Sequence, residues 1–131
     1  MTGETLTYER FTPGAVMGER EQVLDEAAFR RWFALFPEDE RGDLMPAGMV
    51  ASVVMRAYSD ILQNRPPGNV HGSQRFEIAR LPRRGDRLVT ELCCTEKSLR
   101  KERRWVNLKT VTRDAEGRQL FTGEMAIMWA A

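Results

Sequence analysis

The chain has 131 residues, of which 42% are hydrophobic and 30% are charged, and its formal net charge at pH 7 is +1. This length and composition are typical of an ordinary globular protein with one core, so we expect a single domain over residues 1–131. Nucleic acids and anionic membranes both attract proteins through a large basic excess, so the near-neutral charge excludes a bulk affinity for either.

The chain is expected to be cytoplasmic. The N-terminal segment Met1–Thr5 lacks the basic start and apolar core of a signal peptide. The longest apolar run, Leu44–Met55, is shorter than the roughly 18 residues that suggest a membrane span. Cys93 and Cys94 are adjacent in a predicted strand, where neighbouring side chains point to opposite faces, so a disulfide between them is geometrically poor. Two reduced cysteines that serve as packing residues suit the cytoplasm.

Two helices are predicted in the first half of the chain. The first begins after Asp25, a good capping residue, and ends at Pro37. Its apolar residues recur at three- and four-residue spacing, namely Ala28, Phe29, Trp32, Phe33 and Phe36. A polar surface loop, residues 38–43, follows. The second helix runs from Pro46 to about Leu62, is about 25 Å long, and is too apolar to be exposed.

The second half of the chain is predicted to form four long strands. The segment Asn64–Gly68 contains two prolines and a glycine, so it ends the helix. The alternation of apolar residues predicts strands over 70–81, 86–99, 105–113 and 119–129. Residues 114–117 carry a hairpin turn signal, and a further strand is expected within 11–23. These elements predict an α+β fold in which one sheet wraps around one central helix.

Such a fold has an exposed sheet edge and an uncovered apolar flank. Both features favour pairing with a second copy or with a related chain. We therefore expect a dimer on physical grounds alone.

The segment from Val70 to Asp86 carries a resemblance to a known family. It reads His-Gly-Ser-Gln-Arg-Phe from His71 to Phe76, followed by Pro82 and Gly85-Asp86. This pattern resembles the MaoC-like acyl-CoA and acyl-ACP hydratases, and above all their FAS1-like N-terminal half. The resemblance covers roughly Tyr8–Trp129.

The resemblance implies a hot-dog fold, an antiparallel sheet wrapped around one long central helix. It further implies an acyl-CoA or acyl-ACP thioester as ligand and no cofactor. The oligomer that it implies is a homodimer, or a heterodimer with a MaoC-like subunit, with the thioester bound between subunits. Because hot-dog proteins share the fold across several chemistries, the fold by itself leaves the reaction open.

The predicted catalytic region is the loop before the second helix. MaoC-like hydratases carry an Asp-x-Asn-Pro-x-His motif there, because reversible hydration needs one group to activate water and another to handle the proton on the adjacent carbon. By this resemblance, Asp39 stands at the Asp position, whereas Leu44 stands where the histidine would be. Ala47-Gly48-Met49 then matches a family His-Gly-Met, with Ala47 replacing the histidine.

Five residues form the predicted site. Gly48, flanked by Ala47 and Met49, is the predicted substrate-binding position, because a free N–H at a helix start can donate to a thioester carbonyl. Alternatively, Gly48 only permits close helix–sheet packing. Asp39 is a catalytic candidate or a solvated loop acid. His71, the only histidine, is a second catalytic candidate or a strand residue bonded to backbone or water, and one histidine predicts no metal site.

Basic residues cluster on either side of the second predicted strand. Arg83-Arg84 precede it and Arg100–Arg104 follow it. These side chains are candidates for binding the phosphates of coenzyme A or the acidic face of an acyl carrier protein. The alternative is that they are solvated turn charges paired with Asp86 and Glu102.

Three functions remain open from the sequence. The first is a MaoC-like hydratase or dehydratase, alone or as the substrate-binding half of a heteromeric enzyme, and the incomplete Asp-His motif favours the second version. The next is a thioesterase in which Asp39 or Glu38 activates water and Gly48 holds the carbonyl. The last is a non-catalytic module that binds acyl-CoA.

Overall fold

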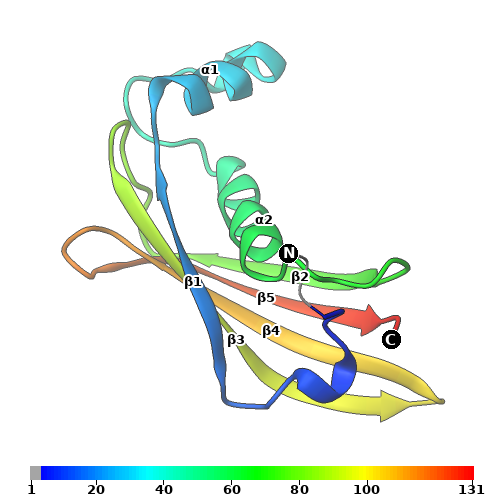
Figure 1. Ribbon diagram of the computed structural model, residues 1–131. Helices are drawn as coiled ribbons and strands as arrows, with labels where there is room; N and C mark the ends of the chain where they lie inside the picture. The colour runs from blue at the N-terminus through cyan, green and yellow to red at the C-terminus, as the bar shows by residue number, and fades with distance from the viewer. Residues whose placement is uncertain (1–3) are drawn as a thin grey trace.

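Five strands form a single antiparallel sheet in the order β1-β3-β4-β5-β2 in the computed structural model (Figure 1). The strands are β1 (Val16–Val23), β2 (Val70–Ile78), β3 (Arg87–Arg100), β4 (Arg103–Arg113) and β5 (Gln119–Trp129). The helices are α1 (Glu26–Leu35) and α2 (Met49–Ile61), with short 3-10 turns η1 (Tyr8–Arg10) and η2 (Pro37–Asp39). This arrangement confirms the predicted α+β class with one helix against one sheet.

The structure describes residues 4–131. The first three residues of the segment Met1–Thr5, predicted not to be a signal peptide, therefore lie outside the described part. Within the part that is described, no helix is long and apolar enough to cross a membrane.

The core lies between α2 and the sheet. Figure 1 shows α2 lying across one face of the sheet, whereas α1 projects beyond it. One face of α2 is buried at Val50, Val53, Val54 and Ala57. It packs against the inward-facing side chains of the central strands, which include Leu92, Cys94, Leu108, Met125 and Ile127. The removal of this apolar surface from water is the main stabilising term of the fold.

Cys94 is a core residue, as the strand alternation predicts. Both cysteines are free, and Cys94 is buried whereas Cys93 is half-buried. Burial raises the pKa of the Cys94 thiol and outweighs its hydrogen bond to the Glu96 carbonyl. The thiol therefore stays protonated and acts as a packing group rather than as a nucleophile.

Several element ends differ from the predictions by one or two residues: α1 ends at Leu35, β3 spans Arg87–Arg100 and β4 begins at Arg103. Two further ends differ for reasons of local hydrogen bonding. Helix α2 begins at Met49 and not at Pro46, because the N–H groups of Met49 and Val50 bond to carbonyls three residues back, as in a 3-10 turn. Strand β2 ends at Ile78 and not at Leu81, because the next two N–H groups both bond to the Leu120 carbonyl. The regular ladder of β2 cannot continue past that shared acceptor.

The hairpin between β4 and β5 is fixed by Asp114. Its Oδ1 accepts hydrogen bonds from the N–H groups of Glu116 at 3.0 Å and Arg118 at 2.9 Å, and its Oδ2 accepts from Arg118 Nε at 2.8 Å. Burial alone raises the pKa of Asp114, but the hydrogen bonds and charge of Arg118, together with the Glu116 N–H, outweigh it and lower the pKa.

We expect this carboxylate to make stability depend on pH. A group whose folded pKa is lowered stabilises the fold above its unfolded pKa of about 3.9, and that stabilisation is lost as pH falls through the folded pKa. The difference in free energy of unfolding between the native chain and Asp114→Asn should therefore be large at pH 7 and shrink below about pH 4. Urea denaturation followed by circular dichroism measures it, and a difference that does not change with pH would contradict the assignment.

Candidate functional site

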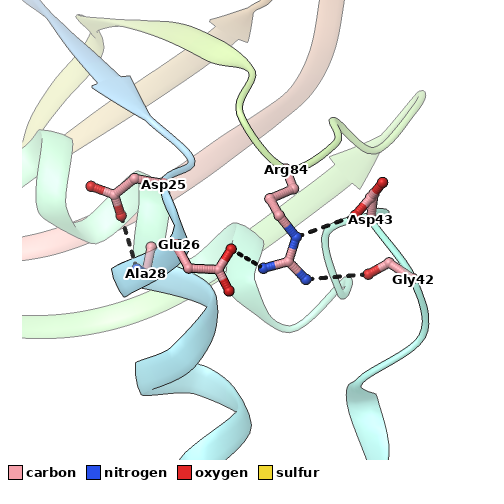
Figure 2. Close-up of polar contacts among 6 residues, drawn as sticks. All are labelled: Asp25, Glu26, Ala28, Gly42, Asp43 and Arg84. Atoms are coloured by element: carbon pink, nitrogen blue, oxygen red, sulfur yellow. Dashed lines mark hydrogen bonds and ion pairs between the residues drawn. The ribbon is translucent and has the colours of Figure 1, made fainter.

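Arg84 joins three segments at the start of α1 (Figure 2). It lies in the turn between β2 and β3, where its Nη1 donates to Glu26 Oε2 at 2.9 Å and its Nε donates to Asp43 Oδ1 at 3.2 Å. Its Nη2 lies 3.5 Å from the Gly42 carbonyl oxygen, and its guanidinium carbon lies 4.3 Å from the centre of the Phe29 ring. Arg84 is thus an internal connector and not the phosphate-binding candidate that the sequence suggested.

Backbone contacts hold the loop before α2 against the same turn. The N–H of Arg84 donates to the Asp43 carbonyl at 2.7 Å, and the N–H of Met45 donates to the Pro82 carbonyl at 2.8 Å. Leu44 lies between these bonds, paired with Arg83 in an isolated bridge. Leu44, which the sequence predicted at the histidine position, therefore has a fixed backbone and a side chain that is 43% exposed.

Asp39 is the acceptor for a tryptophan indole. It ends the 3-10 turn η2, and its Oδ2 accepts a hydrogen bond from Trp32 Nε1 at 2.8 Å. Trp32 belongs to the last two turns of α1, so the bond ties the loop back onto that helix. Asp39 therefore has a hydrogen-bond partner on α1. A loop acid that is only solvated would have no such partner.

The same tryptophan covers Gly48. Gly48 precedes α2 with φ −60° and ψ −27°, values that any residue adopts, so its backbone does not require a glycine. A Cβ at this position would lie 2.7 Å from Trp32 Cζ2, closer than atoms approach in proteins. The missing side chain therefore makes room for the indole ring.

The N–H of Gly48 is available to a ligand in the part of the chain that the structure describes. Its two successors, Met49 and Val50, bond to the carbonyls of Pro46 and Ala47, but no acceptor within residues 4–131 lies on the Gly48 N–H. Ala47 is exposed, whereas Met49 is buried and lines a cavity. This corner of α2 has the free donor that the sequence predicted at a helix start.

His71 lies elsewhere, at the start of the edge strand β2. There it is exposed and pairs with Ile127, close to the C-terminus. Its Nε2 lies 3.0 Å from Gln74 Oε1, and Gln74 Nε2 donates to the Glu124 carbonyl at 3.2 Å. Gln74 thus presents its side-chain oxygen to the ring and joins His71 to the neighbouring strand β5. In the described residues no contact joins His71 to Asp39, so the two catalytic candidates do not form a pair.

A cavity of about 500 Å³ lies between β1, α1 and α2. Trp32 forms part of its wall, together with Met49 from the first turn of α2. The sequence identified Trp32 only as an apolar residue of the first helix. No local signal could have shown its role, because its contacts with Asp39 and Gly48 cross the break at Pro37.

Solved structures of other proteins share this architecture. An R-hydratase from Pseudomonas aeruginosa superposes with a TM-score of 0.75 at 20% identity, over 95% of this chain and 86% of that chain. A MaoC-like dehydratase from Rhodospirillum rubrum gives 0.79 at 15% identity, over 96% and 98%. The chain has the hot-dog fold of the MaoC-like hydratases.

A heteromeric relative has the same fold. The 3R-hydroxyacyl-ACP dehydratase complex from Mycobacterium tuberculosis gives a TM-score of 0.65 at 14% identity, over 83% of this chain and 90% of that chain. No protein-family model matches the chain, and no curated protein matches it either. The likeness thus confirms the hot-dog fold, and the reaction has to be argued from the site.

The Trp32–Asp39 bond should contribute measurably to stability. Asp39→Ala should lower the free energy of unfolding by about 1–2 kcal/mol, because a partly buried hydrogen bond to a charged group is lost. Asp39→Asn should cost less, since an amide oxygen still accepts. The matched control is Glu40→Ala on the exposed neighbour, expected to change stability by less than about 0.5 kcal/mol. A double-mutant cycle with Trp32→Phe tests the bond itself, and strict additivity of the two changes would contradict it.

The close contact between Gly48 and Trp32 makes a second prediction. Gly48→Ala should destabilise the native chain by about 1–3 kcal/mol, because the new methyl group displaces the indole. In a Trp32→Ala background the same change should instead stabilise by up to about 1 kcal/mol, since alanine favours helical backbone. Thermal or urea unfolding of the native chain, the two single variants and the double variant measures both effects. Equal effects in both backgrounds would show that the ring does not explain the glycine.

Proposed function

We propose that this chain is the substrate-binding subunit of a hydratase or dehydratase that acts on an acyl thioester, and that a related hot-dog chain supplies the acid–base pair. One observation carries the proposal. The loop before α2 has Leu44 at the histidine position, and its acid, Asp39, is bonded to the Trp32 indole. A fold shared with hydratases is therefore combined with a loop in which the histidine is replaced and the acid is bonded to an indole, so that the acid–base pair is incomplete.

The thioester would bind at the start of α2. A free N–H at Gly48, at the positive end of the helix dipole, suits a carbonyl oxygen that gains negative charge. The carrier in this proposal is coenzyme A or an acyl carrier protein. Neighbouring Ala47 and Met49 complete the predicted binding positions.

Exposed apolar side chains support a partner chain at this end of the molecule. Leu35 and Phe36 at the end of α1 are 75% and 45% exposed, and Leu44 in the following loop is 43% exposed. The two edge strands, β1 and β2, also have unpaired backbone groups on their outer sides. A homodimer, or a heterodimer with a MaoC-like subunit, would cover such surfaces. The mycobacterial dehydratase that shares the fold is itself a complex.

We expect the purified chain to leave crotonyl-CoA unchanged. Mass spectrometry in one time course should show neither addition of water nor release of free coenzyme A, because no acid–base pair is present. Mixing the chain with a MaoC-like protein that retains the Asp-His motif should raise hydration well above that of this second protein alone.

Three results would contradict the proposal. Hydration by the isolated chain would show that other residues perform the acid–base chemistry. Release of coenzyme A, abolished by Asp39→Asn or Glu38→Gln, would instead establish the thioesterase alternative. Binding of crotonyl-CoA without any reaction, and without activation of a partner, would leave the non-catalytic binding module.

A further inference from the structure

The cavity between β1, α1 and α2 contains more positive charge than its own acids neutralise. Five charged residues line it: Arg20, Glu21, Asp25, Arg31 and Arg56. Glu21 is paired with Arg87, and Asp25 caps α1 by accepting from the Ala28 N–H at 2.9 Å. Arg20 is paired with Asp60 at 3.0 Å. Both acids and Arg20 therefore already have a partner within the chain.

Arg31 and Arg56 are the two remaining charged residues of the cavity. Arg31 comes from α1 and Arg56 from α2, so each of two helices contributes an arginine to the lining of the cavity. Within residues 4–131 neither side chain forms an ion pair or a hydrogen bond. Two unpaired guanidinium groups on one cavity select an anionic group, and carboxylates suit their planar donors.

Apolar side chains share the lining of the cavity with these charged groups. The apolar residues are Val23, Leu24, Ala28, Trp32, Leu35, Met49 and Val53. The one amide in the wall, that of Gln22, donates to the Val53 carbonyl at 2.9 Å and so joins β1 to α2 at the base. A volume of about 500 Å³ lies within the range of small-molecule sites. The cavity therefore suits a ligand that has an apolar chain and one acidic group.

Trp32 places the cavity next to the position proposed for the thioester. One part of its ring lies on Gly48, and the same side chain forms part of the cavity wall. An acyl group held by its carbonyl at Gly48 would thus lie beside Trp32 and Met49, two residues that line the cavity.

We propose that this cavity binds an acyl chain that ends in a carboxylate, with Arg31 and Arg56 pairing the carboxylate and the chain lying against Trp32 and Val53. The inference deepens the proposed function and rests on it, because it names the substrate class as a carboxyacyl thioester. The apolar part of the lining favours an acyl chain with a carboxylate over the phosphate groups of coenzyme A, which would contact only the charged part.

The test compares glutaryl-CoA with pentanoyl-CoA by isothermal titration of the full chain. The two acyl groups have equal carbon number, differ in the terminal carboxylate, and are saturated, so neither can be hydrated. Glutaryl-CoA should bind about tenfold tighter, because two guanidinium groups contact its carboxylate. Arg31→Gln and Arg56→Gln should each reduce this preference severalfold and leave the affinity for pentanoyl-CoA unchanged. Arg30→Gln, on the neighbouring residue outside the cavity, is the matched control.

The possible outcomes separate this inference from the proposed function. Equal binding of the two thioesters would overturn the carboxylate site and leave the proposed function standing. If both arginine variants weaken glutaryl-CoA, pentanoyl-CoA and free coenzyme A alike, the arginines bind the carrier's phosphates and the inference is wrong. If neither thioester binds to a chain that circular dichroism shows to be folded, the proposed function fails as well.

Discussion

The burial of one face of α2 against the sheet determines how the rest of the chain is arranged. This helix is only 13 residues long, about 20 Å, and so covers the sheet incompletely. The edge strand β2 remains largely exposed as a result, and the apolar end of α1 projects beyond the sheet. The same constraint leaves the start of α2 accessible from one side. The position proposed for the thioester and the exposed apolar end of α1 therefore lie at the same end of the molecule. This is why we propose ligand binding and subunit pairing there.

Trp32 organises the loop before α2. Its ring takes the space at Gly48, and its N–H takes the carboxylate of Asp39. These two contacts hold the loop against α1, while Arg84 holds the loop's other end against the turn between β2 and β3. The loop is therefore organised for support. Asp39, a catalytic candidate from the sequence, accepts a hydrogen bond from the Trp32 indole in the structure.

The sequence predicts the fold well because the three central strands β3, β4 and β5 each bury one face, which produces a visible alternation. β5 has the predicted ends, and the alternation of Leu92 and Cys94 against Cys93 places the right side chains in the core. The start of α2 was less accessible to prediction, since a proline permits both a helical and a 3-10 first turn. The contacts that Trp32 makes in the cavity wall could not be predicted from the sequence. Trp32 contacts Asp39 and Gly48 only because the chain reverses at Pro37. The spacing of residues within a helix or a strand carries no information about contacts across such a reversal.

The position of Trp32 also makes it a built-in optical reporter. The chain has three tryptophans. Trp129 is buried against Phe11 with its indole bonded to the Leu6 carbonyl, and Trp105 stacks with Arg100 on the β3–β4 hairpin. Neither lines the cavity, whereas the half-buried Trp32 has a carboxylate on its N–H and a cavity along its ring. A ligand in the cavity would therefore contact this indole and neither of the other two, so that a change in tryptophan fluorescence on binding would come from Trp32.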